Sequence, residues 1–104
     1  MILGAIDIVS NAVRLLIATI QQVDDKIFLK KNTLTRVPIR LGEDVFVEGE
    51  ISKKNVKRLV KTMRAFELLM EVNGVEGFRA CATSAMREAS NGKLVMKKIK
   101  LRAI

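Results

Sequence analysis

The first 20 residues contain two apolar runs separated by one polar turn. Residues 2–8 and 12–20 are rich in Ile, Leu, Val and Ala, which predicts two buried strands. Only Val9, Ser10 and Asn11 lie between them. Three residues are enough for a tight turn but not for a crossover, so the two strands are predicted to form an antiparallel hairpin.

The next apolar run is followed by a segment without a clear period. Residues 27–37 are predicted to form a third strand that ends at Pro38, because proline cannot donate to a ladder. Residues 38–51 mix glycines and acids, and an irregular connection is expected there. Its acids, which we expect to be solvated surface, are Glu43, Asp44, Glu48 and Glu50.

A long helix is predicted after this connection. Ser52 is a favourable N-cap residue, and Asn73-Gly74 is a C-terminal stop signal. Between them, apolar side chains recur at spacings of three and four, which predicts one buried stripe along about five turns. The stripe consists of Val56, Leu59, Val60, Met63, Phe66, Leu69 and Met70.

The last third of the chain is predicted to hold one strand and two short helical pieces. Residues 78–82 alternate between apolar and other side chains, which predicts a strand. Thr83 or Ser84 is predicted to cap a short helix that ends at Asn91-Gly92, and residues 93–100 are predicted to be helical.

This order of elements predicts a mixed α/β sheet with flanking helices. A strand that follows a long helix returns beside the first strand in parallel, by a right-handed crossover. No linker or internal boundary interrupts the chain. Because such a sheet usually continues with another strand, we interpret residues 1–104 as a truncated, N-terminal part of one domain.

The charge of the chain predicts an anionic partner. Lys and Arg number 19 against 11 Asp and Glu, which gives a formal net charge of +8. Phosphate compounds, nucleic acid and acidic surfaces all suit this balance, and a solvated basic face without a ligand remains an alternative. Histidine is absent, which excludes histidine-based triads and metal sites.

Other counts place the chain among non-membrane proteins of a reducing compartment. No apolar run reaches the roughly 18 residues of a membrane span. The one cysteine, Cys81, cannot form an internal disulfide, which favours the cytoplasm. Because no histidine is available to activate it, Cys81 is expected to be an inert, buried thiol.

Polar groups inside the first apolar hairpin are the first candidate site. Asp7 is expected at the end of the first strand, with Ser10 and Asn11 in the turn. A hydroxyl, an amide and turn N–H groups can surround a phosphate, and a carboxylate beside a phosphate suits Mg²⁺. Ordinary turn chemistry is the alternative, and Arg14 could either pair with Asp7 or hold an anion.

A second cluster follows the last predicted strand. Thr83 and Ser84 supply hydroxyls at a predicted helix start, and Arg87 could reach a phosphate with its forked donors. A capping pair with a surface arginine is the structural alternative. Because parallel strands one and four would end at the same sheet edge, both clusters are expected to face one crevice.

Three segments resemble motifs of the exopolyphosphatase / guanosine pentaphosphate phosphohydrolase family. Residues 7–15, DIVSNAVRL, are similar to its D-x-G-S-N-x-x-R-L signature. Residues 82–89, ATSAMREA, resemble its A-T-S-A-x-R-x-A motif, and residues 40–44 its RLGE stretch. The order of the three motifs is the family's order.

The resemblance implies a ribonuclease-H-like fold of the actin-like ATPase superfamily, here as an incomplete N-terminal lobe. It also implies release of terminal phosphate from polyphosphate or guanosine pentaphosphate with Mg²⁺. The family's catalytic role on the metal and water side falls on Asp7. Its phosphate contacts fall on Ser10, Asn11, Arg14, Thr83, Ser84 and Arg87.

Two departures from the family pattern are visible. Val9 stands where the family has a glycine, and no glutamate follows Glu88 to act as the catalytic glutamate. We therefore expect this chain alone to be catalytically silent. Two other functions remain open: a non-catalytic polyanion or nucleic-acid-binding module, and half of an actin-like ATPase or kinase domain.

An unfinished sheet has a further consequence. Its unpaired edge and uncovered apolar surface predict self-association into a homo-oligomer.

Overall fold

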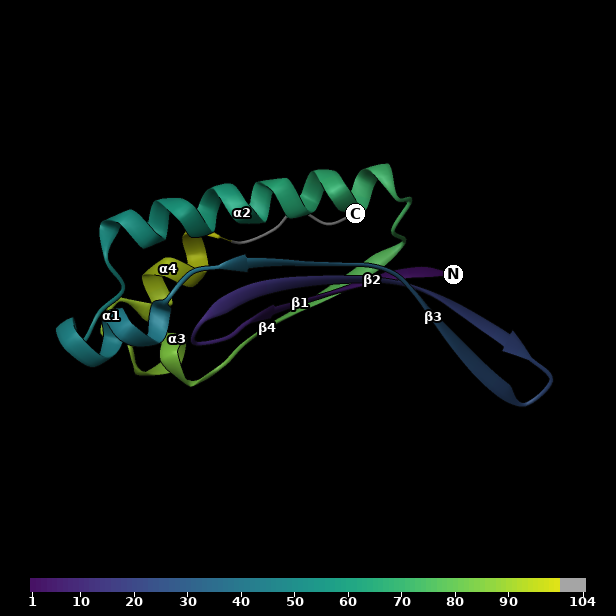
Figure 1. The fold of residues 1–104 in the computed structure, drawn as a ribbon, viewed down its shortest axis with the longest axis horizontal. Helices are drawn as coiled ribbons and strands as arrows, with labels where there is room; N and C mark the ends of the chain where they lie inside the picture. Colours follow the sequence, from purple (N-terminus) through teal and green to yellow (C-terminus); the bar gives the residue numbers. More distant parts are fainter. Residues whose placement is uncertain (100–104) are drawn as a thin grey trace.

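A computed structural model describes residues 1–99 and has a four-stranded sheet with helices at one face and one end (Figure 1). The strand order is β3-β2-β1-β4. β1 pairs antiparallel with β2 and parallel with β4, while β2 pairs antiparallel with β3. The predicted mixed α/β topology is therefore confirmed. The elements are β1 Ile2–Ile8, β2 Ala12–Val23, β3 Lys26–Pro38, α1 Leu41–Glu48, α2 Lys53–Val72, β4 Gly77–Ala82, α3 Ser84–Glu88 and α4 Gly92–Lys98.

α2 covers one face of the sheet (Figure 1). Its start is capped as predicted, because the Ser52 hydroxyl oxygen accepts from the Asn55 N–H at 3.2 Å. Gly74, in the left-handed region at φ 69°, follows its end. The apolar stripe of α2 packs against alternate residues of β1 and β2, as the helical and strand periods require. Leu69 is the exception, because it is 38% exposed and lies outside this core. Core residues exposed by 1% or less include Ile6, Val13, Leu15, Ile17, Leu59, Phe66 and Met70.

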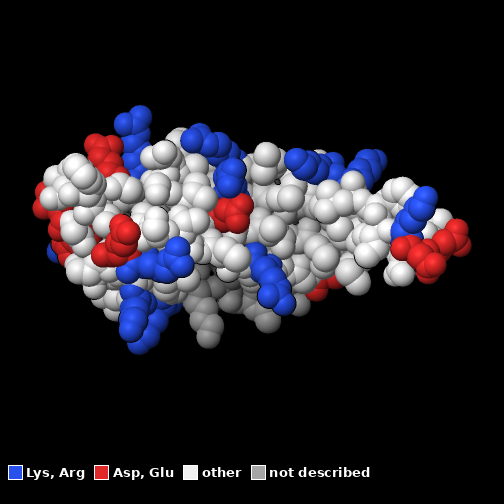
Figure 2. Space-filling view, turned by 90° about the horizontal axis from the view of Figure 1, so that it is seen from below, with Lys and Arg blue, Asp and Glu red and all other residues white. Residues whose placement is uncertain are grey.

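The opposite face of the sheet is uncovered in residues 1–99, and we call it the open face. Strand pairing places Asp7 opposite Arg14, and Leu16 opposite Leu34, on this face. Asp7 is also the neighbour of Cys81 on β4, and Cys81 is exposed. The expectation of a buried thiol is therefore wrong, because the side chain lies on the face that α2 does not cover. Figure 2 shows this face, where basic groups and fewer acidic groups are spread over uncharged surface.

The segment before α2 is more regular than the sequence indicated. Residues 38–51 were expected to be irregular, yet Leu41–Glu48 forms α1. The helix ends at Gly49, whose φ of 73° is left-handed and whose N–H donates to the Val45 carbonyl at 2.9 Å. Arg40 holds the N-cap position without a side-chain cap bond, so the usual start signal is missing.

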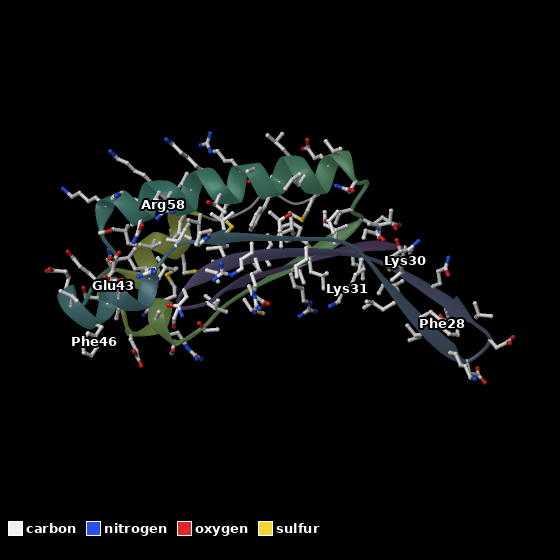
Figure 3. All side chains as sticks on the ribbon, in the orientation of Figure 1. Phe28, Lys30, Lys31, Glu43, Phe46 and Arg58 are labelled. Carbon is white, nitrogen blue, oxygen red and sulfur yellow. The ribbon has the colours of Figure 1, made fainter. Side chains whose placement is uncertain are left out.

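β2 and β3 extend beyond the rest of the sheet as a long hairpin. Both strands continue past their predicted ends and meet at a tight turn, where Asp24 has a φ of 55°. Residues 21–30 are all exposed. Figure 3 shows Phe28 on this projection and Phe46 of α1 at the other end of the molecule. The overall extents are 51 × 23 × 20 Å.

Two further expectations concern the end of the chain and the membrane. α4, Gly92–Lys98, confirms most of the predicted helical piece, and residue 100 lies outside the described residues. Within the part of the chain that the structure describes, no helix is both long and apolar enough to span a bilayer.

Candidate functional site

The turn between β1 and β2 is tight. The Val9 N–H donates to the Ala12 carbonyl at 2.9 Å and closes the turn. Among residues 1–99, the only non-glycine residue with a positive φ is Asp24. Val9 therefore adopts a backbone conformation open to any residue, and this loop does not need glycine for its φ angle. Ser10 is half-buried and Asn11 is exposed.

The second cluster lies directly beside this turn. β1 and β4 run in parallel, with Ile8 paired to Ala82 at their carboxyl ends. The Ile8 carbonyl then accepts from the Thr83 N–H at 2.9 Å and from the Thr83 hydroxyl at 3.2 Å. Thr83 does occupy the N-cap position of α3, but its hydroxyl makes no cap bond there. Instead, it ties the two polar clusters together at one edge of the sheet.

α1 closes the same edge from the other side of the turn. The Gly42 N–H donates to the Ser10 carbonyl at 2.9 Å. A Cβ placed on Gly42 would lie 3.0 Å from the Ser10 Cβ, which is closer than side chains ordinarily approach. Glycine in the RLGE stretch therefore lets α1 sit against the Ser10 loop.

Asp7 and Arg14 form an ion pair on the open face. Arg14 Nη2 lies 3.3 Å from Asp7 Oδ2, and the two side chains are 44% and 51% exposed. Of the two roles left open for Arg14, pairing with Asp7 is therefore observed. At this exposure the pair contributes about 0–1 kcal/mol to stability, so it does not explain why the chain places charges inside an apolar hairpin.

Arg36 adds a further cation next to the Asp7–Arg14 pair on the open face, and the sequence did not lead us to predict it. The register of β2 and β3 places Arg36 directly opposite Arg14. Like charges at such positions destabilise a sheet. Among the described residues, neither ion pair includes Arg36. Pro38 pairs with Ala12, and Arg36 lies two residues before Pro38. The two-residue period of a strand then places Arg36 opposite Arg14, so this period could have revealed Arg36 once the pairing was known.

α3 carries the remaining predicted phosphate contacts. It spans only Ser84–Glu88, with Ala85 and Met86 buried and Ser84 and Arg87 exposed. A single short turn has little macrodipole, so any anion binding there depends on side-chain donors rather than on a long helix. The structure therefore leaves the predicted Ser84 and Arg87 groups free on the surface beside the Thr83 junction.

The acids of α1 behave in two ways. Glu43, Glu48 and Glu50 are exposed, as expected. Asp44 is not simply solvated, because its Oδ2 accepts from the Ser52 N–H at 3.0 Å and from Asn55 Nδ2 at 2.8 Å. Burial alone would raise the pKa of Asp44, but these hydrogen bonds hold that pKa below its ordinary value. Asp44 therefore joins α1 to the start of α2, and its assignment as a surface acid was wrong.

Comparison with known proteins gives the family. The sequence profile of the Ppx/GppA phosphatase family matches residues 18–103. The chain belongs to this family. Among solved structures, a Ppx/GppA family member from Aquifex aeolicus is similar with a TM-score of 0.86 and 29% identity, over 96% of this chain and 31% of that one. The expected ribonuclease-H-like fold of the actin-like ATPase type is therefore confirmed.

Curated relatives cover nearly all of this chain but little of their own length. Exopolyphosphatase 1 of Mycobacterium tuberculosis is 29% identical over 98 residues, which are 94% of this chain and 28% of that protein. A bifunctional 3-dehydroquinate synthase/phosphatase of Fusobacterium nucleatum is 30% identical over 99 residues, or 92% of this chain and 15% of that protein. The chain thus spans less than a third of the curated relatives it matches.

Proposed function

We propose that this chain is the N-terminal part of the phosphatase domain of a phosphohydrolase that releases terminal phosphate from polyphosphate or guanosine pentaphosphate. Family membership supports a phosphohydrolase, and relatives named exopolyphosphatase favour polyphosphate. The observation that carries the proposal is the double hydrogen bond from Thr83 to the Ile8 carbonyl. It brings two polar clusters, 75 residues apart in sequence, to one edge of the sheet.

The residues at this edge offer different kinds of donor for binding a phosphate. Ser10, Asn11 and Ser84 offer hydroxyl and amide donors, while Arg87 offers a forked, charged donor. Thr83 supports the junction between strands. Arg14, already held by Asp7 at 3.3 Å, adds positive charge from the open face. Donors on both sides would orient a terminal phosphoryl group for in-line attack by water and stabilise its charge.

Asp7 is the proposed ligand for a magnesium ion. Within residues 1–99, no group of three or more metal-ligating side chains is present, so a site made of protein ligands alone does not fit. Mg²⁺ often binds through one carboxylate together with substrate phosphates, and such a site does fit here. The Asp7 side chain is 51% exposed and uses one oxygen for Arg14. A bound magnesium ion would neutralise phosphate charge during transfer.

A binding experiment tests the phosphate site. Tripolyphosphate is titrated into the 104-residue chain by calorimetry with Mg²⁺, using Arg87→Gln and the control Arg64→Gln on α2. Loss of a charged, forked contact should weaken binding about tenfold in Arg87→Gln, while the control keeps the affinity of the parent chain. Equal losses in both variants, or no binding by the parent chain, would contradict the proposal.

A phosphate-release assay tests the expected catalytic silence. We expect no turnover of polyphosphate by this chain with Mg²⁺, since no glutamate follows Glu88. Turnover would show that this chain alone is sufficient for catalysis and would contradict the expectation. The alternatives separate in the same titrations: a nucleic-acid module would bind DNA independently of Mg²⁺ with a steep salt dependence, and an ATPase or kinase half-domain would prefer ATP to tripolyphosphate.

We also propose that the chain self-associates in the cytoplasm through the open face or the β4 edge. The open face carries exposed apolar side chains, including Leu34 at 61% and Leu29 at 57%. β4 has β1 as a partner on one side and is the last strand of the sheet, which leaves an edge available for pairing. Light scattering at rising concentration should show a growing mass, and a constant monomer mass would contradict this.

A further inference from the structure

A groove beside α3 carries two lysines, Lys93 and Lys97, that no role yet explains. It has a volume of about 890 Å³ and runs from Ala82, at the carboxyl end of β4, between α3 and α4. Arg87 lies at its α3 side, and Lys93 and Lys97 lie at its α4 side. Because Ala82 directly precedes Thr83, the groove starts next to the proposed phosphate site.

The groove differs from other hollows of the described surface in the amount of its uncompensated charge. Its lining contains three cations and no acid. The hollow on the open face also lacks an acid, but it has one cation, Arg79, in an otherwise uncharged lining. The hollow between α2 and the end of α4 combines Arg64 with Glu67 and Glu71. The hollow between α1 and α2 combines Arg58 with Glu43. The uncompensated positive charge of the groove therefore matches a polyanion.

The two lysines are held together on one side of α4. Lys93 and Lys97 are four residues apart, so they share a helix face and repel each other. Val95, 1% exposed, fixes the opposite face of the helix in the core. A Cβ on Gly92 would collide with the Met86 carbonyl, so a glycine is needed for α4 to begin this close to α3. Among the described residues, neither lysine takes part in an ion pair.

The lining also discriminates between the two substrates of the proposed function. Guanine presents O6 and N7 acceptors, which Lys and Arg can bind, and also N–H donors, which need carboxylate, amide or carbonyl acceptors. The groove offers no acidic, amide or aromatic side chain. Phosphate groups, in contrast, need only cations and N–H or O–H donors. The side chains of the lining can therefore bind every group of a phosphate chain but offer no carboxylate or amide to the N–H donors of guanine, which favours a phosphate chain over a guanosine.

We propose that this groove binds the internal phosphate groups of linear polyphosphate, while the terminal group lies at the Ser10 and Ser84 edge. The inference rests on the proposed function and adds to it a site for chain length. Lys93 and Lys97 would bind phosphates beyond the first three, so their contribution grows with the length of the chain. Arg87 lines the groove and belongs to α3, which begins at Ser84, so it would serve both sites.

A pair of matched double variants tests the groove. Lys93→Gln/Lys97→Gln removes the two groove lysines. Lys57→Gln/Lys61→Gln removes two exposed lysines of α2 that are also four residues apart. The two double variants therefore lose the same charge. Tripolyphosphate and long-chain polyphosphate are titrated into each, and thermal melts followed by circular dichroism check folding.

The expected result depends on ligand length. The groove variant should lose about tenfold in affinity for long-chain polyphosphate, as for two exposed charge contacts, and less than about twofold for tripolyphosphate. The α2 variant should change little for either ligand. Equal losses in the two double variants, or a groove loss independent of ligand length, overturn the inference.

Other outcomes separate the groove from the phosphate site. If the parent chain binds and Arg87→Gln weakens binding while the groove variant does not, only the groove inference fails. If the parent chain binds neither polyphosphate, both proposals fail. If a guanosine polyphosphate depends on Lys93 and Lys97 more strongly than long-chain polyphosphate does, the groove is a nucleotide site and the inference is overturned.

Discussion

The two ends of this elongated molecule are built differently. At the end that holds Ser10 and Thr83, backbone groups from distant segments are joined, by Gly42 to Ser10 at 2.9 Å and by Thr83 to Ile8 at 2.9 Å. At the other end, the β2–β3 hairpin exposes all of residues 21–30. The contrast is visible in Figure 3, where Phe28 projects on the bare hairpin and Arg58 lies among neighbours near α1.

The two ends of the sheet therefore differ in how well they can hold a binding site. Side chains anchored to buried backbone hold a fixed arrangement of donors, as phosphate binding requires. Arg58 adds an exposed tie at the same end, since its Nη2 donates to the Pro38 carbonyl at 2.8 Å and joins the end of β3 to α2. Among the described residues, no hydrogen bond joins residues 21–30 of the hairpin to another element, so the ladder between β2 and β3 alone maintains them. We therefore expect equal substitutions to have unequal effects at the two ends.

The largest effect is expected for Leu41→Ala. Leu41 begins α1 and is fully buried, so removing its side chain leaves a cavity and should reduce the free energy of unfolding by about 2–5 kcal/mol. Urea denaturation followed by circular dichroism measures this change. A loss below about 1 kcal/mol would show that the site end is no better packed than the hairpin.

Asn91→Ala comes next. The Asn91 side chain accepts from the Ile51 N–H at 2.9 Å and donates to the Ile51 carbonyl at 2.9 Å, and Ile51 is 2% exposed. Two buried backbone groups lose their partners, so the variant should be about 1–3 kcal/mol less stable.

Asn32→Ala is the matched control for this substitution. Asn32 exchanges hydrogen bonds of 3.1 and 2.8 Å with Thr19 at an exposed position of the hairpin. Water can replace these bonds, so we expect a loss within about 0.5 kcal/mol. Equal losses for the two asparagines, again from urea denaturation, would remove the proposed contrast.

Asp44→Asn has a smaller effect that depends on pH. Hydrogen bonds from Ser52 and Asn55 hold the pKa of Asp44 below its ordinary value in the folded state. The unfolded chain therefore binds the proton first, and the stability that Asp44 contributes is present above its ordinary pKa and lost as the pH falls through the lowered one.

Melting temperatures between pH 5 and pH 2 measure this contribution. The parent chain should lose more stability on acidification than Asp44→Asn does. Asp25→Asn, at the exposed hairpin turn, serves as the control and should follow the parent chain. The same acid response in the parent chain and in Asp44→Asn would contradict the assignment.

The smallest effect is expected for Leu29→Ala. This is the same substitution as Leu41→Ala, at a side chain that is 57% exposed on the hairpin. The free energy of unfolding should change by less than about 0.5 kcal/mol. If the open face mediates self-association, the variant should also lower the mass seen by light scattering. A loss comparable to that of Leu41→Ala would mean that the hairpin is packed in solution.

The sequence was sufficient for the elements with a strong pattern. The apolar runs of β1 and β2, the stripe of α2, and the Ser52 cap all follow rules that act within a few residues. The parallel pairing of β4 with β1 followed from the handedness of crossovers. That parallel pairing placed the two clusters at the same edge, and the Thr83 bonds to Ile8 confirm that they are neighbours.

The missed features depend on contacts between distant residues. α1 has no side-chain cap at Arg40 and is eight residues long. Its formation therefore depends on tertiary contacts, such as the one between Gly42 and Ser10. Asp44 became structural only through Ser52 and Asn55. Burial of Cys81 could not be judged from alternation alone, because alternation gives two faces without saying which one α2 covers.

The bond between Ile8 and Thr83 also constrains the order in which the protein can fold. It closes a loop of 75 residues, so the β1–β2 hairpin and α2 can emerge from the ribosome and form local contacts well before Thr83 exists. During synthesis at about 5–20 residues per second, the turn that carries Ser10 would wait several seconds without its neighbour. Assembly of the two clusters is therefore a late event, and a nascent chain lacking β4 would expose the edge of β1 that β4 later pairs with.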